Sequence, residues 1–399
     1  MAKLKLGFIL GSGLENLELL EEYKEINAET PFGKTSSPII TGKIKGIDVA
    51  IIFRHGKKHE IPPTFVNNKA NIFALKYEGC KYILSTTDAN SLKEEIKIGD
   101  FIALDDIIDF TKSRESTFYE KFEFGAMHAY MNNPFSEILR KKIIETCEEF
   151  KFPIHKTGTA ITIEGSRYST KAESKIFQQF RADVSTMTIA PECILSNEAE
   201  IPYGTIAVCG DYDAWKENID FSEDTNQIRK DSFEKIKKIL LKIIESFSRE
   251  EEIKKLKEKV RIVYDFPKQG ETFYDISQLL SDRDSLKKLT EILYERYKDK
   301  KIDVIASTEL RSFAIAGILA DKLNTGLVII NKEVRRDLIQ PNQKVLLIDE
   351  AFSENSQQVC LDIKNLQSEI VELCFITEYK KLEKELSVPV FSLIKFEGE

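Results

Sequence analysis

Short apolar runs that end in polar segments recur along the first half of the chain. The first three lie at residues 5–10, 47–53 and 82–85. Runs of this length, rich in Ile, Leu and Val, are typical of strands that are buried on both faces of a sheet. Apolar residues at helical spacing separate them, as at residues 67–78. The pattern therefore predicts an α/β fold in which buried strands alternate with helices.

A second α/β segment begins near residue 260. It follows a charged stretch, residues 224–259, whose apolar residues recur at helical spacing. Beyond this stretch, helices are predicted at residues 284–297, 313–323 and 357–365, and strands at 303–306, 326–330, 344–349 and 371–377. Such alternation is typical of a doubly wound parallel sheet. A chain of 399 residues is long for one hydrophobic core, so we predict domains at 1–248 and 260–399, joined by a linker helix at 249–259.

The composition favours a cytoplasmic protein that binds neither nucleic acid nor membranes. The net charge is −8, whereas nucleic-acid-binding domains are usually basic. No apolar run reaches membrane-spanning length, and the N-terminal residues lead directly into a strand. The six cysteines form no C-x-x-C pair, and the four histidines are scattered apart from His55 and His59. We therefore expect neither a disulfide framework nor a metal site.

Polar side chains follow each of the first three predicted strands. Ser12 lies in a glycine-flanked turn that leads into a predicted helix at 14–23, an arrangement that presents backbone N–H groups to an anion. Arg54 and His55 follow the second strand and suit a phosphate, and Thr87 follows the third. Ligands of open α/β sheets gather at such strand ends, so the three segments together predict one site. Taken singly, each is also consistent with a solvated turn.

Two carboxylates, Asp211 and Asp213, follow the apolar run 206–210. In an extended segment, residues two apart project to the same side. Neighbouring carboxyl groups do not both ionise easily, so one can hold a proton near neutral pH and donate it. Such a donor suits a purine leaving group, because negative charge collects on the ring as its bond to the sugar breaks and a protonated Asp beside N7 neutralises it. The second acid can accept from a 6-amino group. A polar turn after a core strand is the alternative interpretation.

Several motifs in the first half occur in the order of one family. They are Gly-Ser-Gly-Leu at 11–14, Thr-Pro-Phe-Gly-Lys at 30–34, Arg-His-Gly-Lys-Lys-His at 54–59, Thr-Ile-Glu-Gly at 162–165, Met-Thr at 187–188 with Pro-Glu at 191–192, and Asp-Tyr-Asp-Ala-Trp at 211–215. With these motifs, the chain from residue 5 to about residue 215 and the following helix resembles the 5′-methylthioadenosine phosphorylases, of the trimeric purine nucleoside phosphorylase group.

This resemblance implies a role for each matching residue. The phosphate would be held by Ser12, Arg54, His55, Thr87 and Thr188. The nucleoside would be held by Met187 at the ribose, Tyr168 and Ser169 beside the base, Asp211 at N7 and Asp213 at the 6-amino group. Phosphate, as co-substrate and without a cofactor, would attack C1′ of 5′-methylthioadenosine to give adenine and 5-methylthioribose 1-phosphate.

Near this predicted site, the chain departs from the family at three places. Asp88-Ala89-Asn90 stands where the family has Ala-Cys-Gly, Gly210 replaces a Thr, and Thr186 replaces an Asn. A carboxylate beside bound phosphate repels it by several kcal/mol when both are charged and poorly solvated. Two alternatives therefore stay open: a nucleosidase in which water is the nucleophile, or a binding and assembly protein without activity.

The chain from about residue 263 to 399 resembles the adenine phosphoribosyltransferases. The matching segments are 265–270, 273–276, 309–313, 345–350 and 389–393. The two resemblances together imply a phosphorylase-type mixed sheet flanked by helices, followed by a smaller phosphoribosyltransferase-type parallel-sheet domain. Asp349 and Glu350 match the family's ribose-binding acids.

The features that phosphoribosyl transfer needs are altered in this second half. The family's Ala-Thr-Gly-Gly-Thr phosphate loop is here Ser-Glu-Asn-Ser-Gln at 353–357, and only residues 332–343 stand in for a long catalytic segment. A loop without glycines and with an added negative charge is poorly suited to a phosphate, so we expect this half to be non-catalytic.

The resemblances also bear on assembly. The first family is typically trimeric and the second typically dimeric. A trimer-based homo-oligomer is therefore expected, and a two-fold contact through the second domain would extend it to a hexamer.

Overall fold

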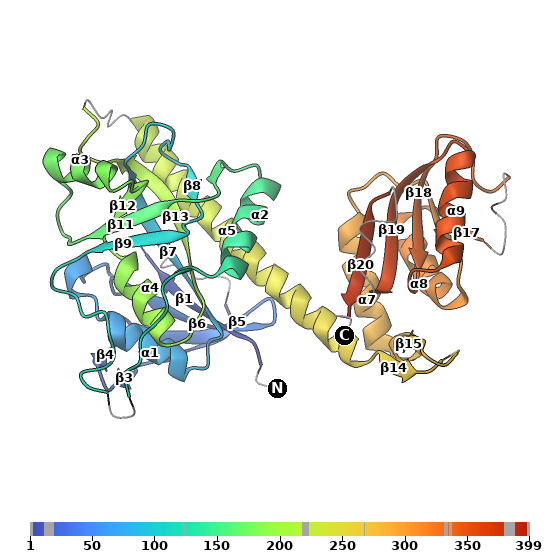
Figure 1. Ribbon diagram of the computed structural model, residues 1–399, viewed down its shortest axis with the longest axis horizontal. Coiled ribbons are helices and arrows are strands. Elements are labelled where there is room, and N and C mark those ends of the chain that lie inside the picture. Colours follow the sequence, from blue (N-terminus) through green and yellow to red (C-terminus); the bar gives the residue numbers. More distant parts are fainter. Residues whose placement is uncertain are drawn as a thin grey trace. The chain divides into compact units, whose positions relative to one another are not determined.

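The structure of the protein is a computed structural model that describes residues 3–11, 20–122, 125–217, 223–266, 268–330, 334, 337–378 and 388–396. It contains two compact units, Met1–Ser248 and Arg249–Glu399 (Figure 1). Ser12, which the sequence places at the phosphate, and most of the predicted helix 14–23 lie outside the described residues.

The first unit is organised around a mixed sheet in which 11 strands are described. At its centre, β1 (Lys5–Leu10) pairs in parallel with β6 (Ile47–Phe53) and with β7 (Tyr82–Ser91). β7 pairs in parallel with β13 (Tyr203–Tyr212). The sheet is completed by β2 (Glu21–Ile26), β5 (Ile39–Ile44), β8 (Phe101–Ile102), β9 (Asp106–Phe110), β10 (Ile154–His155), β11 (Thr159–Ile163) and β12 (Val184–Thr186). A separate hairpin is formed by β3 (Glu29–Thr30) and β4 (Gly33–Lys34).

Helices cover both faces of this sheet, as Figure 1 shows. They are η1 (Pro63–Phe65), α1 (Asn68–Tyr77), α2 (Glu137–Glu149), α3 (Lys171–Gln179), α4 (Ile189–Glu198) and α5 (Glu223–Glu258), whose last turns belong to the second unit. Phe8 of β1 packs in a core with residues of α2 and α5, whereas Ile9 packs in a second core with residues of α1 and α4. Successive side chains of a strand point to opposite faces, so a strand that is apolar throughout requires a cover on each. The predicted mixed sheet flanked by helices is confirmed.

Parallel pairing brings the ends of β1 and β6 to one edge, with Leu10 opposite Phe53. The backbone N–H of Arg54 donates to the carbonyl of Leu10 at 3.0 Å. Two local predictions are wrong. Glu21 begins a strand and does not lie in a helix, and residues 86–91 continue β7 instead of forming a turn. β7 stays extended through these polar residues because β13 pairs with it from Ile83 to Ser91.

The second unit contains a parallel sheet in the strand order β17-β16-β18-β19-β20. Its strands are β16 (Val304–Ser307), β17 (Gly326–Ile329), β18 (Lys344–Asp349), β19 (Glu369–Glu378) and β20 (Val390–Lys395). The helices are α6 (Ser277–Ser281), α7 (Arg283–Tyr297), α8 (Leu310–Leu323) and α9 (Glu354–Asn365), and β14 (Arg261–Tyr264) pairs with β15 (Thr272–Asp275). The predicted parallel sheet is confirmed, with a separate apolar core on each face.

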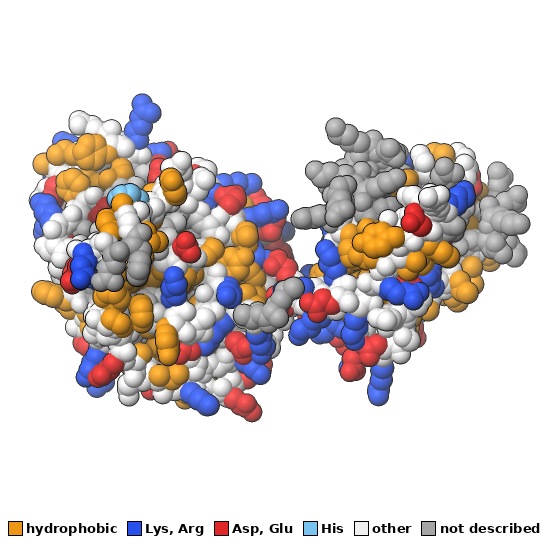
Figure 2. Space-filling model, turned by 60° about the horizontal axis from the view of Figure 1, so that its bottom comes forward, with side chains coloured by type: hydrophobic (Ala, Val, Ile, Leu, Met, Phe, Trp, Pro, Cys, Tyr) orange, Lys and Arg blue, Asp and Glu red, His pale blue; other side chains and the backbone are white. Residues whose placement is uncertain are grey.

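Three further observations concern the whole chain. The six cysteines are buried and unpaired with one another. Within the described ranges, no helix is both long and apolar enough to cross a membrane. Figure 2 shows Lys and Arg side chains interspersed with Asp and Glu over the visible face of each unit.

Candidate functional site

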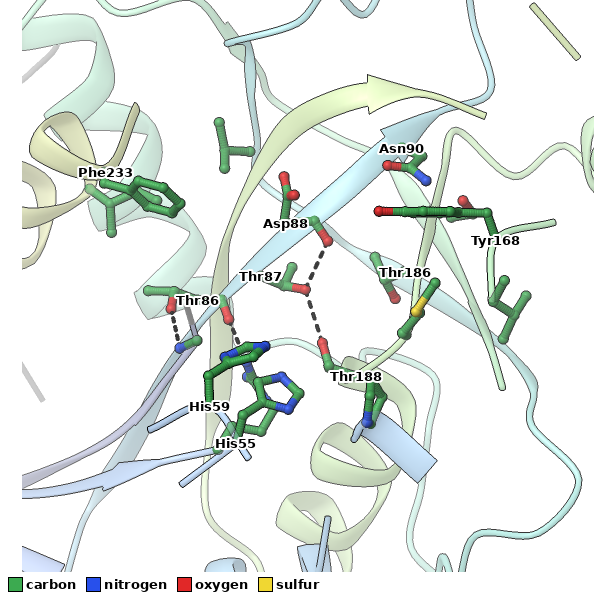
Figure 3. A pocket seen from close by; sticks show the side chains of 18 residues that line it. His55, His59, Thr86, Thr87, Asp88, Asn90, Tyr168, Thr186, Thr188 and Phe233 are labelled. Carbon is green, nitrogen blue, oxygen red and sulfur yellow. Dashed lines mark hydrogen bonds between the residues drawn. The ribbon is translucent and has the colours of Figure 1, made fainter. Parts of the chain in front are cut away.

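A cavity of about 260 Å³ lies in the first unit, beside the ends of β1 and β6 (Figure 3). Six of the residues that the sequence assigns to substrate line it: Arg54, His55, Thr87, Tyr168, Met187 and Thr188. Segments more than a hundred residues apart therefore meet at one place. Among the described residues, Ser169, Asp211 and Asp213 do not line the cavity.

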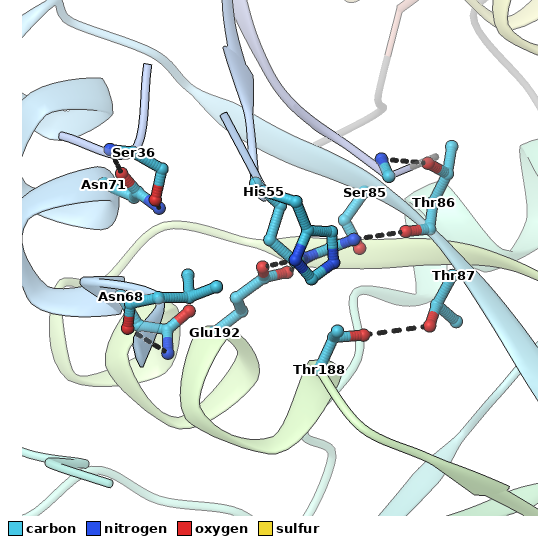
Figure 4. A network of polar contacts seen from close by, with 12 residues as sticks. Ser36, His55, Asn68, Asn71, Ser85, Thr86, Thr87, Thr188 and Glu192 are labelled. Atoms are coloured by element: carbon cyan, nitrogen blue, oxygen red, sulfur yellow. Dashed lines mark hydrogen bonds and ion pairs between the residues drawn. The ribbon is translucent and has the colours of Figure 1, made fainter. Parts of the chain in front are cut away.

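Arg54 is fixed in a buried polar network (Figure 4). Its Nε and Nη2 donate to the two carboxylate oxygens of Glu192, with an Nη2–Oε2 distance of 2.9 Å, and its Nη1 donates to the Thr86 carbonyl at 2.8 Å. Arg54 is 1% exposed and Glu192 is 0% exposed. Of the five N–H donors of a guanidinium, three are thus in use, so at most two remain for a ligand. Glu192 also compensates the charge of Arg54.

The same network continues away from the cavity. The hydroxyl of Tyr203 donates to Glu192 at 2.8 Å and lies 2.6 Å from the hydroxyl of Ser85. A two-oxygen contact with additional hydrogen bonds is the geometry that makes a buried ion pair tolerable. Glu192 therefore holds the guanidinium in one orientation at the cavity wall.

His55 offers the cavity a lone pair and not a positive charge. Its Nδ1 lies 2.9 Å from the carbonyl of Ile61. Because a carbonyl only accepts hydrogen bonds, Nδ1 carries the proton and Nε2 is left as an acceptor. Burial, together with the positive charge of Arg54, lowers the pKa of His55 to about 4. At neutral pH, His55 can accept a hydrogen bond from a protonated phosphate oxygen.

Two hydroxyl groups face each other at the base of the cavity. The hydroxyls of Thr87 and Thr188 lie 3.0 Å apart. Thr188 is the N-cap residue of α4, yet its side chain makes no capping hydrogen bond. Helix N-termini present N–H groups and a positive partial charge, and this position suits an anion.

Met187 and Tyr168 also line the cavity, and Tyr168 lies near Asn90 (Figure 3). Tyr168 is 72% exposed. The backbone around Met187 is held by Arg114, which donates to the Met187 carbonyl at 2.5 Å, to the Ile163 carbonyl at 3.1 Å and to Glu164 at 3.2 Å. This buried arginine therefore positions the residues that precede α4.

Asp213 lies behind the cavity wall and is only 2% exposed. One carboxylate oxygen accepts from the hydroxyls of Ser169, at 3.0 Å, and of Ser185; the other accepts from the N–H of Ala214 at 2.6 Å. Ser185 lines the cavity whereas Asp213 does not. Of the hydrogen-bonded residues Ser185 and Asp213, Ser185 is therefore the one that can contact a ligand.

Asp211 is partly buried near the end of β13. It accepts from the N–H of Tyr212 at 2.8 Å. The register of β13 against β7 shifts between Cys209 and Asp211. This irregularity precedes Asp211, and β13 ends at Tyr212, so the strand alternation that would place Asp211 and Asp213 on one side does not extend to Asp213.

Three residues with evident importance for the site were not assigned a role from the sequence. Glu192 and Arg114 orient other side chains, and Ser185 joins Asp213 to the cavity. Glu192 belongs to the Pro-Glu motif at 191–192, for which the resemblance gave no role, and Arg114 lies in a segment without periodicity. Their roles depend on contacts across 28 to 138 residues, for which local sequence carries no signal.

In the second unit, Asp349 has a set of partners within the protein. One oxygen accepts from the N–H and the hydroxyl of Thr308, both at 2.9 Å, and the other accepts from Ser356 at 2.8 Å. Asp349 is 0% exposed and burial raises its pKa. These bonds tie the end of β18 to the residue after β16 and to the first turn of α9.

Glu350, the neighbour of Asp349, is 3% exposed and its Oε2 lies 2.8 Å from Nε of Arg311. Burial raises the pKa of Glu350 to about 7, with the nearby charge of Glu309 acting in the same direction. The two neighbouring acids therefore differ in environment. Asp349 is stabilised by hydrogen bonds, whereas Glu350 is stabilised by its ion pair with Arg311.

Residues 5–245 match the sequence profile of a family described as the phosphorylase superfamily. The chain is 47% identical over 218 residues to the S-methyl-5′-thioadenosine phosphorylase of Xenopus tropicalis, which is 54% of this chain and 78% of that protein. It is 41% identical over 250 residues to the S-methyl-5′-thioadenosine phosphorylase of Thermofilum pendens, covering 63% and 95%. A solved structure of methylthioadenosine phosphorylase from Schistosoma mansoni in complex with tubercidin matches with a TM-score of 0.58 at 33% identity, over 61% of this chain and 92% of that chain.

Proposed function

Because the chain belongs to the phosphorylase superfamily, we propose that it cleaves 5′-methylthioadenosine with phosphate to give adenine and 5-methylthioribose 1-phosphate. The protein is then a pentosyltransferase that acts in purine and methionine salvage. The observation that carries the proposal is the cavity, around which anion-binding hydroxyls, a neutral imidazole and an aromatic side chain meet.

In the proposed reaction, phosphate accepts hydrogen bonds from Thr87, Thr188 and the remaining N–H groups of Arg54, and it donates one to Nε2 of His55. The glycine-flanked turn that contains Ser12 also binds the phosphate. A phosphate oxygen attacks C1′ of the sugar while the C1′–N9 bond breaks and its electron pair moves to the purine. A proton at N7 neutralises that charge.

The nucleoside side of the site is assigned in the same way. Met187 lies at the ribose, and Tyr168 and Ser169 flank the base. Asp211 supplies the proton to N7, and Asp213 acts on the 6-amino group through the hydroxyl network that joins it to the cavity. The reaction needs phosphate as co-substrate and no cofactor.

Adenine release from 5′-methylthioadenosine by the purified full-length protein tests the proposal. We expect release with phosphate present and none after phosphate has been removed. Release without phosphate would identify a nucleosidase. No release by the folded protein in either condition would identify a binding protein.

A variant ties this activity to the assigned site. Asp211→Asn removes the proton donor and is expected to lower kcat by about 10²- to 10⁴-fold. Glu217→Gln removes an exposed carboxylate from the same region of sequence and serves as the matched control. Equal kcat in the two variants would show that Asp211 is not the acid.

For the second unit, we propose a phosphoribosyltransferase-like domain that no longer transfers a phosphoribosyl group. The hydrogen bonds that Asp349 makes within the protein and the glycine-free segment 353–357 support this. Adenine and 5-phosphoribosyl 1-pyrophosphate should give no AMP with the full-length protein, and AMP formation would overturn the assignment.

We further propose a cytoplasmic, trimer-based homo-oligomer, which becomes a hexamer if the second unit also forms a two-fold contact. Light scattering of the full chain tests it, and a monomeric mass would contradict it.

A further inference from the structure

One carboxylate, that of Asp88, lines the cavity among its described residues. Asp88 follows Thr87 on β7, and successive side chains of a strand point to opposite sides. The Thr87 hydroxyl faces Thr188, whereas the Asp88 side chain is directed toward β13 and away from that pair (Figure 3). The carboxylate is therefore separated from the hydroxyls assigned to phosphate.

Gly210 of β13 makes room for this side chain. A Cβ atom at position 210 would lie 2.1 Å from Oδ1 of Asp88 and 2.6 Å from its Cγ. No such contact is tolerated, so any side chain at position 210 would displace the carboxylate. Asp88 thus occupies the volume that a side chain at position 210 would fill, and the two residues act as a pair.

The surroundings of Asp88 favour a ligand that donates hydrogen bonds. Val208 is opposite Asp88 in the sheet register, and Phe233 and Ile236 of α5 line the same cavity. Arg54, the guanidinium in the cavity wall, is already paired with Glu192. A carboxylate has about four acceptor sites, so it can accept from a ligand in addition to its contacts within the protein.

The order of residues along β7 indicates which part of the ligand meets Asp88. Thr87 lies in the phosphate part of the cavity, and Asn90 lies near Tyr168 in the part assigned to the base (Figure 3). Three steps of a strand span about 10 Å, comparable to a nucleoside. Along the strand, Asp88 lies between these two residues, as the sugar lies between the phosphate and the base in the bound reactants. A sugar offers hydroxyl donors, whereas a phosphate dianion is repelled.

We propose that Asp88, placed by Gly210, accepts a hydrogen bond from a hydroxyl of the nucleoside's sugar and selects sugars that carry this hydroxyl. The inference rests on the proposed function, because it assumes that the cavity holds a nucleoside. Hydrogen bonds to charged groups discriminate by about 10- to 100-fold, which sets the expected preference.

The test compares kcat/KM for adenine release from 5′-methylthioadenosine and from its 2′-deoxy and 3′-deoxy analogues. The natural protein should reject one deoxy analogue by about 10- to 100-fold, and that analogue identifies the hydroxyl. Asp88→Ala should abolish this discrimination. Gly210→Ala should do the same, because it displaces the carboxylate without removing its charge. Glu29→Ala, which removes a carboxylate outside the cavity lining, is the matched control.

Two results would overturn the inference: unchanged discrimination in a folded Asp88→Ala protein, or an effect of Asp88→Ala on the KM for phosphate alone. If the protein releases adenine from none of these nucleosides, the proposed function is contradicted, but the inference about Asp88 is not. Thermal-shift titrations with 5′-methylthioadenosine and its two deoxy analogues then test the inference by binding, with the same expected loss of discrimination in both variants.

Discussion

At the scale of single residues, Glu192 decides what Arg54 can offer to a ligand. It takes two N–H groups of the guanidinium and compensates its charge in a fully buried site. Glu192→Gln leaves that charge uncompensated, and we expect it to lower the free energy of unfolding by about 3–5 kcal/mol. Urea denaturation measures this.

A double variant separates stability from activity at the same pair. Arg54→Met with Glu192→Leu removes both charges, and such replacements are often neutral for stability. We expect it to recover most of the stability that Glu192→Gln loses, without recovering kcat/KM for phosphorolysis. Recovery of both would show that Arg54 has no role at the substrate.

The lowered pKa of His55 makes stability depend on pH. The folded protein protonates His55 only near pH 4, whereas the ordinary value is 6.5. As the pH falls from 6.5 toward 4, the unfolded chain gains a proton that the folded protein does not, so stability falls. Over this interval, denaturant titrations should show a smaller loss for His55→Gln than for the natural protein. Parallel losses would contradict the assignment of a neutral His55.

At the scale of elements, α5 combines two tasks on different residues. Phe233 is half-buried and lines the cavity, whereas Ile239 is fully buried in the core beneath the sheet. Phe233→Ala should raise the KM for nucleoside about tenfold, because it removes apolar contact worth roughly 1.5 kcal/mol.

Ile239→Ala provides the comparison on the same helix. It should lower the free energy of unfolding by about 2–5 kcal/mol, with kcat and KM of the folded protein unchanged. The two variants are measured by steady-state kinetics and by denaturation. A kinetic effect of Ile239→Ala equal to that of Phe233→Ala would show that the helix acts as a whole.

At the scale of the whole molecule, each unit has its own apolar cores. We therefore expect calorimetry of the full chain to show two unfolding transitions. Leu346→Ala, in the core of the second unit, should destabilise one of them by about 2–5 kcal/mol. Phosphate with adenine should raise the midpoint of the other. A single transition that moves in both experiments would show that the units unfold together.

Much of the fold follows from the sequence because it depends on local periodicity. The strands at 5–10 and 47–53 and the helix near 67–78 are recovered at their observed positions. The predicted strand 82–85 is shorter than the observed β7, which extends to Ser91. Its polar residues 86–91 are typical of a turn, and only the pairing with β13 explains why they are extended.

By itself, the sequence determined the alternation of strands and helices, the phosphorylase resemblance, and six of the side chains that line the cavity. Those properties depend on residue type and order. Only the tertiary structure decided that Glu192 orients Arg54, that His55 is neutral with its Nδ1 bound to the Ile61 carbonyl, and that Asp88 occupies the space that a side chain at position 210 would fill. Each of these three features depends on burial and on contacts between residues far apart in the chain. Burial and long-range contacts are not encoded in any local sequence pattern.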